Sequence, residues 1–327
     1  MIKWGEHPRD IKLGDWKFRH IRLKDKEIFE DYSKRCNYPI NLWSTNFAYL
    51  WADSQGDQKM VMWKIEDEML VPFVLYRSEG LHVVCLPLGS GKRDKILYVT
   101  YKCLKFCDKW NQKNGFNRGT LRTINQDQLE FFQRSPKFRD YFDPRKMNGL
   151  ERHFSIEKIT ELKGKDFHRV RNQLNRFNRE YPGAVIRPYQ HRDYEPVLRV
   201  NRSWLKKAQN NYSVIFDQVY FREIMRYHDR LDHLVLVVEV DGSIVGMVSA
   251  GITPDGQSWG CLIKKMADMD GLNEVMIVEI AREIKRLYPN VELLNVGSDL
   301  GVEGLSQFKE KFRPVMSLER YRVRLKG

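Results

Sequence analysis

The feature that most constrains the fold is a pair of adjacent apolar strands in the second half of the chain. Leu234–Val240 (LVLVVEV) predicts a buried strand, and Asp241-Gly242 predicts a two-residue hairpin turn because both residue types tolerate a positive φ. Ser243–Gly251 returns as the neighbouring strand, and Gln257–Lys264 makes a third strand after a Pro-Asp-Gly turn. Three consecutive antiparallel strands are therefore expected at the centre of this half.

Further elements flank these strands in a recognisable order. A strand at Val185–Tyr189 and helices at about 193–210 and 219–230 precede them. An amphipathic helix follows over Leu272–Leu287 and ends before Pro289. The remaining elements are a strand at Val291–Val296, a helix at Leu300–Lys311 and a strand at Val315–Arg324. The order β-α-α-β-β-β-α-β-α-β resembles that of the GNAT acyltransferase fold.

The N-terminal half has the same order of elements, although no residue-level repeat is visible. Its long helix fits Arg93–Lys113. The expected strands are Trp16–Leu23, Lys59–Ile65, Met69–Arg77, Leu81–Pro87, Phe116–Ile124 and Glu151–Ser155, and the shorter helices Asp25–Cys36, Ser44–Trp51 and Gln126–Arg134. We therefore predict an α/β protein with mixed sheets and a tandem GNAT-like fold. The expected domains are residues 1–155 and 183–327, joined by a basic helix at 156–182.

Composition limits the class of partner. The 327 residues include 56 Lys and Arg against 43 Asp and Glu, a formal net charge of +13, which favours RNA, phosphate-bearing cofactors or an acidic membrane surface. Apolar runs fall short of the ~20 residues of a membrane span, and the charged N-terminus does not resemble a signal peptide. We therefore expect a cytoplasmic protein without a transmembrane segment. The five cysteines lack the spacing of a metal site, so no metal is expected.

A basic helix is predicted between the two halves. Phe167, Val170, Leu174, Phe177 and Tyr181 follow one another at spacings of three and four residues, which places them on one face. The other faces carry basic and amide side chains that suit phosphate groups: Lys165, His168, Arg171, Asn172, Asn175 and Arg176. Two interpretations stay open, a solvated surface of the helix or a surface that binds a polyanion.

Several short motifs resemble a known family. The first is Leu162-Lys-Gly-Lys165 followed by His168-x-x-Arg171-Asn172-x-x-Asn175-x-Phe177, and the second is Asp299-Leu-Gly-x-Glu303-Gly-Leu305 followed by Lys309 and Arg313-Pro314. Pro87-Leu-Gly89 and Asp25-Lys26 fit as well. Together they resemble an uncharacterised bacterial family that is grouped with the phosphatidylglycerol lysyltransferase C-terminal domain.

The resemblance implies a fold and a chemistry. It implies a tandem GNAT fold, shared with the peptidyltransferases that build peptidoglycan cross-bridges. Those relatives transfer an aminoacyl group from a charged tRNA to a lipid head group or a peptide amine. Their reaction requires alignment of the substrates, a group that takes the amine proton and a donor for the carbonyl oxygen.

Three carboxylates are candidates for the catalytic base or for a group that orients the amine. They are Glu239 at a strand end, and Asp299 and Glu303 at a strand-to-helix turn. Each has a structural alternative, since Asp299 suits a helix N-cap, Glu303 a capping-box acid and Glu239 a solvent-exposed strand end. Asn295 in the preceding strand, and Lys309 and Arg313 in the stretch FKEKFRP, are candidate groups that bind substrate or anion. For Lys309 and Arg313 the alternative is a solvated helix end.

Two further features could bind a ligand. Trp204 could line a ligand tunnel, or it could belong to the core. Gly89-Ser90-Gly91-Lys92 lies where a GNAT enzyme binds the pyrophosphate of CoA, and it is either an anion-binding loop or a plain turn. The corresponding stretch of the second half, 264–271, has one glycine and two acids, which disfavours acetyl-CoA there.

These observations rank three functions. The first is an aminoacyl- or acyl-transferase for an amine or hydroxyl acceptor, with aminoacyl-tRNA as the favoured donor. The second is an acyl-CoA-dependent N-acyltransferase that uses the loop at Gly89–Lys92. The third is a non-catalytic protein that binds RNA or anionic lipid.

Overall fold

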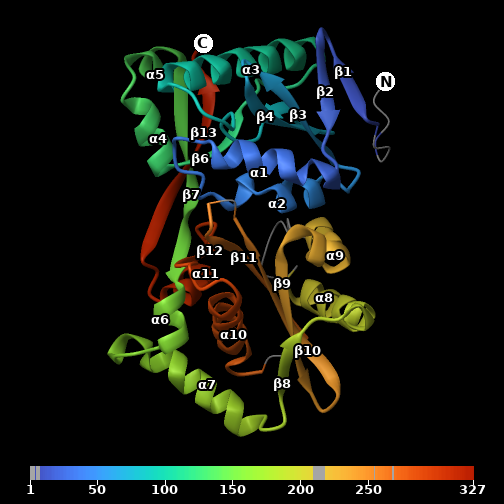
Figure 1. Ribbon diagram of the computed structural model, residues 1–327, viewed down its shortest axis with the longest axis vertical. Helices are drawn as coiled ribbons and strands as arrows, with labels where there is room; N and C mark the ends of the chain where they lie inside the picture. Colours follow the sequence, from blue (N-terminus) through green and yellow to red (C-terminus); the bar gives the residue numbers. More distant parts are fainter. Residues whose placement is uncertain (1–3, 5–7, 209–217, 254, 267–268) are drawn as a thin grey trace. The chain divides into compact units, whose positions relative to one another are not determined.

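The computed structural model describes residues 4, 8–208, 218–253, 255–266 and 269–327. The chain forms two compact units. The first consists of residues 1–149 and 318–327, and the second of residues 150–317. The strands within each unit form a mixed sheet with helices on both faces, as the GNAT-like prediction requires (Figure 1).

The sheet of the first unit has the strand order β1-β2-β3-β4-β5-β6-β13. All neighbours are antiparallel except β5 and β6, which are parallel through Val83 and Leu121. The strands are β1 (Asp10–Leu13), β2 (Trp16–His20), β3 (Lys59–Glu66), β4 (Met69–Tyr76), β5 (Gly80–Val83), β6 (Leu121–Asn125) and part of β13 (Met316–Leu325). The helices are η1 (Leu23–Asp25), α1 (Lys26–Lys34), η2 (Trp43–Thr45), α2 (Phe47–Asp53), α3 (Arg93–Lys113), α4 (Gln126–Gln133) and α5 (Pro136–Tyr141).

The long helix α3 covers one face of this sheet. It buries Ile96, Val99, Cys103 and Cys107 against inward-facing residues of the strands, and the two cysteines are free thiols one turn apart. Helices α1 and α2 cover the other face, where Phe29 packs edge-to-face on Trp63 (Figure 1).

The sheet of the second unit has the order β7-β12-β11-β10-β9-β8. Its strands are the part of β7 (Phe142–Ser155) that begins at residue 150, β8 (Val185–Pro188), β9 (His233–Val240), β10 (Ser243–Ile252), β11 (Ser258–Lys265) and β12 (Leu293–Ser298). Its helices are α6 (Ile156–Glu161), η3 (Lys165–Phe167), α7 (His168–Glu180), η4 (His191–Asp193), α8 (Tyr194–Ala208), α9 (Gln218–Tyr227), η5 (His228–Leu231), α10 (Leu272–Leu287) and α11 (Glu303–Glu310). The parallel pair β11–β12 is joined through Ser258–Leu294 and Trp259–Asn295, and the rest of β11 extends beyond this pairing.

Two groups of helices enclose the second sheet. Helices α6, α7 and α10 pack on one face, where alternate strand residues such as Val248 and Leu294 join the core. Helices α8 and α9 lie on the other face (Figure 1). The helical part of the predicted 156–182 segment therefore belongs to the second unit, because Val170 and Phe177 of α7 are buried in its core.

The last strand of each half lies partly or wholly outside the domain in which we expected it. We expected residues 183–327 in one domain, but β13 pairs with β6 of the first unit through Arg320–Asn125 and Val323–Leu121. The end of β7, expected to close the first domain, instead pairs with β12 through Phe154 and Leu294. The end of β7 therefore joins the strands of the second unit and β13 joins those of the first. Hydrophobic periodicity cannot indicate this exchange, because either set of strands satisfies the same pattern.

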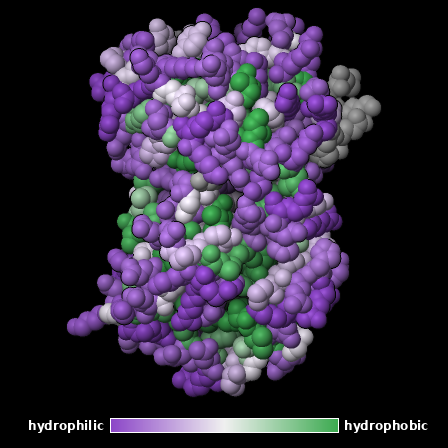
Figure 2. All heavy atoms as spheres, viewed as in Figure 1, coloured by the Kyte–Doolittle hydropathy of each residue, from purple (hydrophilic) through white to green (hydrophobic). Residues whose placement is uncertain are grey.

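The described surface is mainly hydrophilic on the face that Figure 2 shows, in keeping with 30% charged residues. Across the part of the chain that the structure describes, no helix is both long and apolar enough to cross a membrane. Within the same residues, no group of three or more His, Cys, Asp or Glu side chains is placed to hold a metal ion.

Candidate functional site

A fully buried lysine marks the face of the second sheet that packs against α8. Lys264 lies in β11 opposite Met247 of β10, and 0% of its surface is exposed. Its ammonium nitrogen lies 3.2 Å from the centroid of the Trp204 ring on α8. A desolvated cation over an indole gains about 2 kcal/mol. Because lysine is almost never fully buried without a specific environment, this position is chemically distinctive.

A β-bulge in β11 puts Lys264 on this face. Ala250 of β10 pairs with Gly260, but the next residue, Ser249, pairs with Leu262, so the strand contains one extra residue. The extra residue shifts the alternation of side chains by one. Lys264 therefore shares a face with Trp259, whereas strict alternation would place the two residues on opposite faces.

Two polar oxygens without partners lie on the same face. Asn201 precedes Trp204 by one turn of α8, and Ser249 is two residues from Met247 in β10. Among the described residues, neither Asn201 Oδ1 nor Ser249 Oγ has a hydrogen-bond partner, although both atoms are buried. An unsatisfied buried polar group costs about 1–3 kcal/mol, so such groups call for a ligand or a functional reason. Asn201, Trp204, Ser249 and Lys264 are referred to below as the Lys264 cluster.

A second polar group extends along this face. Tyr220 Oη lies 2.6 Å from His233 Nε2, and the rings of His233 and Trp259 are 5.1 Å apart. Burial lowers the pKa of His233 to about 4, so the imidazole is neutral at physiological pH. Gly251 makes this packing possible, because a Cβ there would lie 2.5 Å from Trp259 Nε1 and 2.6 Å from His233 Cε1.

The Lys264 cluster provides groups that suit acyl chemistry. A buried ammonium can stabilise negative charge that develops on a carbonyl oxygen, since the interaction is strong where water is excluded. The oxygens of Asn201 and Ser249 can accept hydrogen bonds from an amine or ammonium. Neither function requires a metal.

Asp299, a predicted catalytic carboxylate, holds the turn between β12 and α11. Its carboxylate accepts hydrogen bonds from the backbone N–H of Leu150 (2.9 Å) and Gly301 (3.2 Å) and forms an ion pair with Arg152 (3.0 Å). Burial alone would raise the pKa of Asp299, but these hydrogen bonds and the Arg152 charge outweigh it and hold the pKa below its usual value. A carboxylate this well satisfied is a weak proton acceptor.

Lys309 and Asn295, which were also predicted as site residues, make contacts around β12. Lys309 Nζ donates to the carbonyl oxygens of Val296, Gly297 and Ser298 at 2.7–2.9 Å, which fixes the end of β12. Asn295 Nδ2 donates to Glu151 Oε1 (2.6 Å). These contacts give Lys309 and Asn295 structural roles within the second unit.

Glu303 and Arg313 lie at the surface. Glu303 begins α11 and accepts a hydrogen bond from Gln307 Nε2 (2.9 Å), and it forms no capping box. Arg313 lies 3.5 Å from Asp166, and both side chains are exposed. Substrate contact by either residue stays a prediction.

Glu239, the third predicted carboxylate, lies near the end of β9. Its Oε2 accepts hydrogen bonds from Arg187, with Nη2 at 3.0 Å, and Arg187 also pairs with Asp193 at 2.6 Å. The charge of Glu239 is therefore already engaged by a cross-strand arginine. The structure does not bring Glu239 together with Asp299 or Glu303 in any described contact, so a shared catalytic role stays a prediction.

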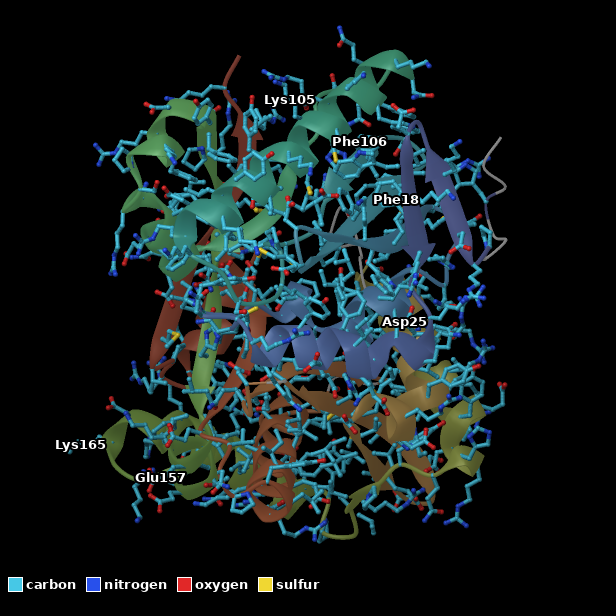
Figure 3. All side chains as sticks on the ribbon, turned by 45° about the horizontal axis from the view of Figure 1, so that its top comes forward. Phe18, Asp25, Lys105, Phe106, Glu157 and Lys165 are labelled. Carbon is cyan, nitrogen blue, oxygen red and sulfur yellow. The ribbon has the colours of Figure 1, made fainter. Side chains whose placement is uncertain are left out.

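The basic helix α7 uses two of its arginines within the second unit. Arg171 Nη1 donates to the carbonyl oxygens of Leu162 and Gly164, where the chain leaves α6. Arg176 forms ion pairs with Glu180 (2.7 Å) and Asp270 (2.6 Å). The remaining predicted polyanion contacts, on this helix and on the preceding η3 turn, are exposed: Lys165, His168, Asn172 and Asn175. Figure 3 shows Lys165 on the outer side of the η3 turn.

The glycine-containing loop of the first unit forms a strand-to-helix connection. The N–H of Gly89 donates to Cys36 Sγ (3.2 Å), and Asn37 Nδ2 donates to the carbonyl oxygen of Gly91 (2.9 Å). Ser90 and Lys92 are exposed, and Lys92 is the N-cap residue of α3. Cofactor binding by this loop stays a prediction.

Sequence reasoning missed Lys264 as a site residue, and it also missed Ser249 and Asn201. The bulge at Gly260–Leu262 conceals the inward orientation of Lys264, since no residue type signals it. Arg152, which joins β7 to the β12–α11 turn, was missed because it lies 147 residues from its partner Asp299.

The strand order, the two units and the buried polar face define a GNAT-like acyltransferase fold. The sequence matches the phosphatidylglycerol lysyltransferase C-terminal family over residues 50–324, so the chain belongs to this family. A comparison with curated proteins found no match.

Solved structures share the fold at low sequence identity. A conserved protein of unknown function from Bacteroides thetaiotaomicron is 19% identical with a TM-score of 0.77, covering 94% of this chain and 99% of that one. L-PGS from Bacillus licheniformis is 16% identical with a TM-score of 0.64, covering 93% and 92%. A tandem GNAT protein from the clavulanic acid biosynthesis pathway is 10% identical with a TM-score of 0.54, covering 95% and 98%.

Proposed function

We propose that this protein is an aminoacyltransferase that uses aminoacyl-tRNA as donor and an amine or a hydroxyl group as acceptor. Membership of the phosphatidylglycerol lysyltransferase C-terminal family supports aminoacyl transfer. The observation that carries the proposal is the Lys264 cluster, which places on one face of an acyltransferase-like sheet a buried ammonium and two oxygens that have no partner among the described residues.

The reaction assigns a part to each group. The acceptor nitrogen or oxygen attacks the carbonyl carbon of the aminoacyl ester and forms the new amide or ester bond. The bond to the ribose oxygen of the tRNA breaks, and the proton of the acceptor ends on that oxygen. Lys264 stabilises the negative charge on the carbonyl oxygen, and Asn201 and Ser249 accept hydrogen bonds from the amino group of the aminoacyl moiety. Of the three candidate carboxylates for proton transfer, Glu303 fits best, because Asp299 is held as a weak proton acceptor and Glu239 is paired with Arg187.

The start of α10 argues against CoA as the donor in the second unit. A Cβ at Gly271 would overlap the backbone carbonyl of Gln173 in α7, so α7 packs closely against this helix end. Asp270 and Glu274 at this helix end are both ion-paired, Asp270 with Arg176 (2.6 Å) and Glu274 with Lys311 (3.3 Å). A pyrophosphate would meet steric exclusion at this helix end, and the nearby cations Arg176 and Lys311 are already engaged by carboxylates.

A transfer assay tests the proposal. The purified protein is incubated with tRNA charged with single radiolabelled amino acids, together with phosphatidylglycerol vesicles or an amine-bearing peptide. The expected result is transfer of label to one acceptor class in the presence of charged tRNA. Acyl-CoA replaces the tRNA in a parallel reaction, and transfer there alone would contradict the proposal and favour the loop at Gly89–Lys92.

A groove on α3 favours a second candidate function, RNA binding without catalysis. The groove has a volume of about 870 Å³ and is lined by five cationic side chains and two carboxylates. Exposed Tyr98 and Tyr141 flank it, and bases stack well on such rings. Figure 3 shows Lys105 on the outer side of α3 and Phe106 on the side toward Phe18 of β2. The concave, aromatic surface suits a nucleic-acid strand better than a flat membrane.

Charge reversal in the groove, combined with the transfer assay, distinguishes RNA binding without catalysis from aminoacyl transfer. Lys105→Glu with Lys109→Glu is expected to weaken tRNA binding and to reduce its salt dependence. If the protein binds tRNA through this groove and transfers no aminoacyl group to any acceptor, the RNA-binding function replaces the proposed one.

A further inference from the structure

Three arginines lie together on one face of the first unit's sheet. Val323 and Leu325 of β13 face the core under α3, so the alternate residues Arg322 and Arg324 lie on the opposite face. Leu121 of the neighbouring strand β6 also faces that core, which places Arg122 beside them. These three residues are referred to below as the arginine face.

The like charges of the arginine face repel one another. Burial lowers the pKa of Arg322, and the charges of Arg122 and Arg324 lower it further. Glu79 is the carboxylate that acts on this group, and it already accepts a hydrogen bond from Arg122 at 2.7 Å. An arrangement of like charges that lowers an arginine pKa destabilises the folded protein unless an anion balances it.

The neighbouring His82 is uncharged and does not change the charge of the arginine face. His82 Nδ1 accepts a hydrogen bond from the backbone N–H of Thr120 (3.1 Å), and its Nε2 lies 3.2 Å from the carbonyl oxygen of Glu79. Burial and the nearby Arg122 lower the pKa of His82 to about 4, so the ring is neutral at physiological pH. The net positive charge therefore comes from the arginines.

Two donor groups of the arginine face have no acceptor within the part of the chain that the structure describes. The Nε atoms of Arg322 and Arg324 are buried and have no hydrogen-bond partner among the described residues. The guanidinium of Arg122 lies over the Tyr76 ring at 4.7 Å, which holds its planar fork in place. Oriented guanidinium groups with free donors are suited to oxyanions with several acceptor oxygens.

We propose that Arg122, Arg322 and Arg324 form a binding site for a phosphate group, carried by a small ligand or a lipid head group. A phosphate offers enough oxygens for more than one guanidinium, and its negative charge offsets the repulsion within the arginine face. This site is separate from the Lys264 cluster. Binding is measured without catalysis, so its failure would leave the proposed transfer reaction untouched.

Calorimetric titration with inorganic phosphate, sn-glycerol 3-phosphate and AMP at low ionic strength tests the proposal. Wild-type protein is expected to bind at least one probe, and Arg322→Gln and Arg324→Gln are each expected to weaken binding about tenfold or more. Tighter binding of glycerol phosphate than of inorganic phosphate would point to a lipid head group, tighter binding of AMP to a nucleotide, and equal binding to free phosphate. Absence of binding for all three probes would overturn the proposal.

A stability measurement distinguishes a binding site from a structural one. Without phosphate, Arg322→Gln is expected to leave the melting temperature unchanged or to raise it, because it removes repulsion. Arg322→Lys keeps the charge and loses the fork, so it provides a folded variant with weakened binding. The matched control is Arg35→Gln, since Arg35 also stacks on a tyrosine, Tyr32 at 4.1 Å, and pairs with Asp31. A lower melting temperature for Arg322→Gln with unchanged probe binding would refute the proposal.

Discussion

The buried Lys264 forms a cation–π pair with the half-buried Trp204, with the ammonium nitrogen 3.2 Å from the centroid of the indole. The pair joins β11 to α8 on the polar face of the second unit. The contact with Trp204 contributes to stability, and the Lys264 ammonium is the proposed oxyanion-stabilising group. Substitution of each residue separates the two contributions.

Replacing Trp204 by Leu tests the structural contribution. The change is expected to lower the free energy of unfolding by about 2–3 kcal/mol, because the ring face that stabilises the Lys264 charge is lost. Trp204→Phe keeps an aromatic face and is expected to cost about half as much. Urea unfolding of both variants provides the measurement, and equal losses would argue against a cation–π contribution.

Gly251 is expected to tolerate no side chain. Gly251→Ala would place a Cβ 2.5 Å from Trp259 Nε1, and relief of this overlap is expected to cost about 3 kcal/mol of unfolding free energy. The control is Gly304→Ala in α11, where nothing lies within 4 Å of the new Cβ, and it is expected to stabilise by about 0.5–1 kcal/mol. Equal effects of the two substitutions would show that the packing around Gly251 is looser than described.

Lys309 is expected to act structurally. Lys309→Met removes the donor to three carbonyl oxygens at the end of β12, and we expect a loss of about 3 kcal/mol or more. Lys285→Met, on the exposed face of α10, is expected to change stability by less than about 0.5 kcal/mol. Thermal unfolding of both variants distinguishes a structural lysine from one that contacts substrate. Unchanged stability with lost transfer activity would restore Lys309 as a substrate-binding residue.

The lowered pKa of His233 predicts that the protein loses stability on mild acidification. Its folded-state pKa of about 4 lies below the usual value of 6.5, so the native state favours the neutral ring. The stabilisation is complete above pH 6.5 and is lost as the pH falls toward 4, by up to about 3 kcal/mol. Urea unfolding at several pH values should show this slope, and His233→Gln should reduce it. A slope that is unchanged in His233→Gln would contradict the assignment.

Sequence patterns predicted most of the second unit because its signals are local. The hairpin at Asp241-Gly242 and the helix at Leu272–Leu287 depend on turn chemistry and periodicity, and both are present in the structure. The predicted helix Arg93–Lys113 is also confirmed. The short strand β1 and helix α5 were missed, since β1 has only four residues and α5 only six.

The features that define the candidate site depend on non-local contacts. The exchange of β7 and β13 between the units follows from pairings between residues far apart in sequence, such as Val323 and Leu121. The seam of α7 was predicted correctly, but the use of Arg171 as a cap for α6 follows from tertiary packing. The alternating arginines of β13 are visible in the sequence, and an alternation of charged and apolar residues in a strand is the signal that could have identified them.

The most direct test of the central claim is single-turnover aminoacyl transfer by wild-type protein and by Lys264→Met. Methionine fills a similar volume without the charge, and circular dichroism with thermal unfolding verifies that the variant is folded. Loss of a group that stabilises an oxyanion typically lowers the rate 100- to 1,000-fold, and we expect a decrease of about this size. A folded Lys264→Met variant that transfers at the wild-type rate would contradict the account.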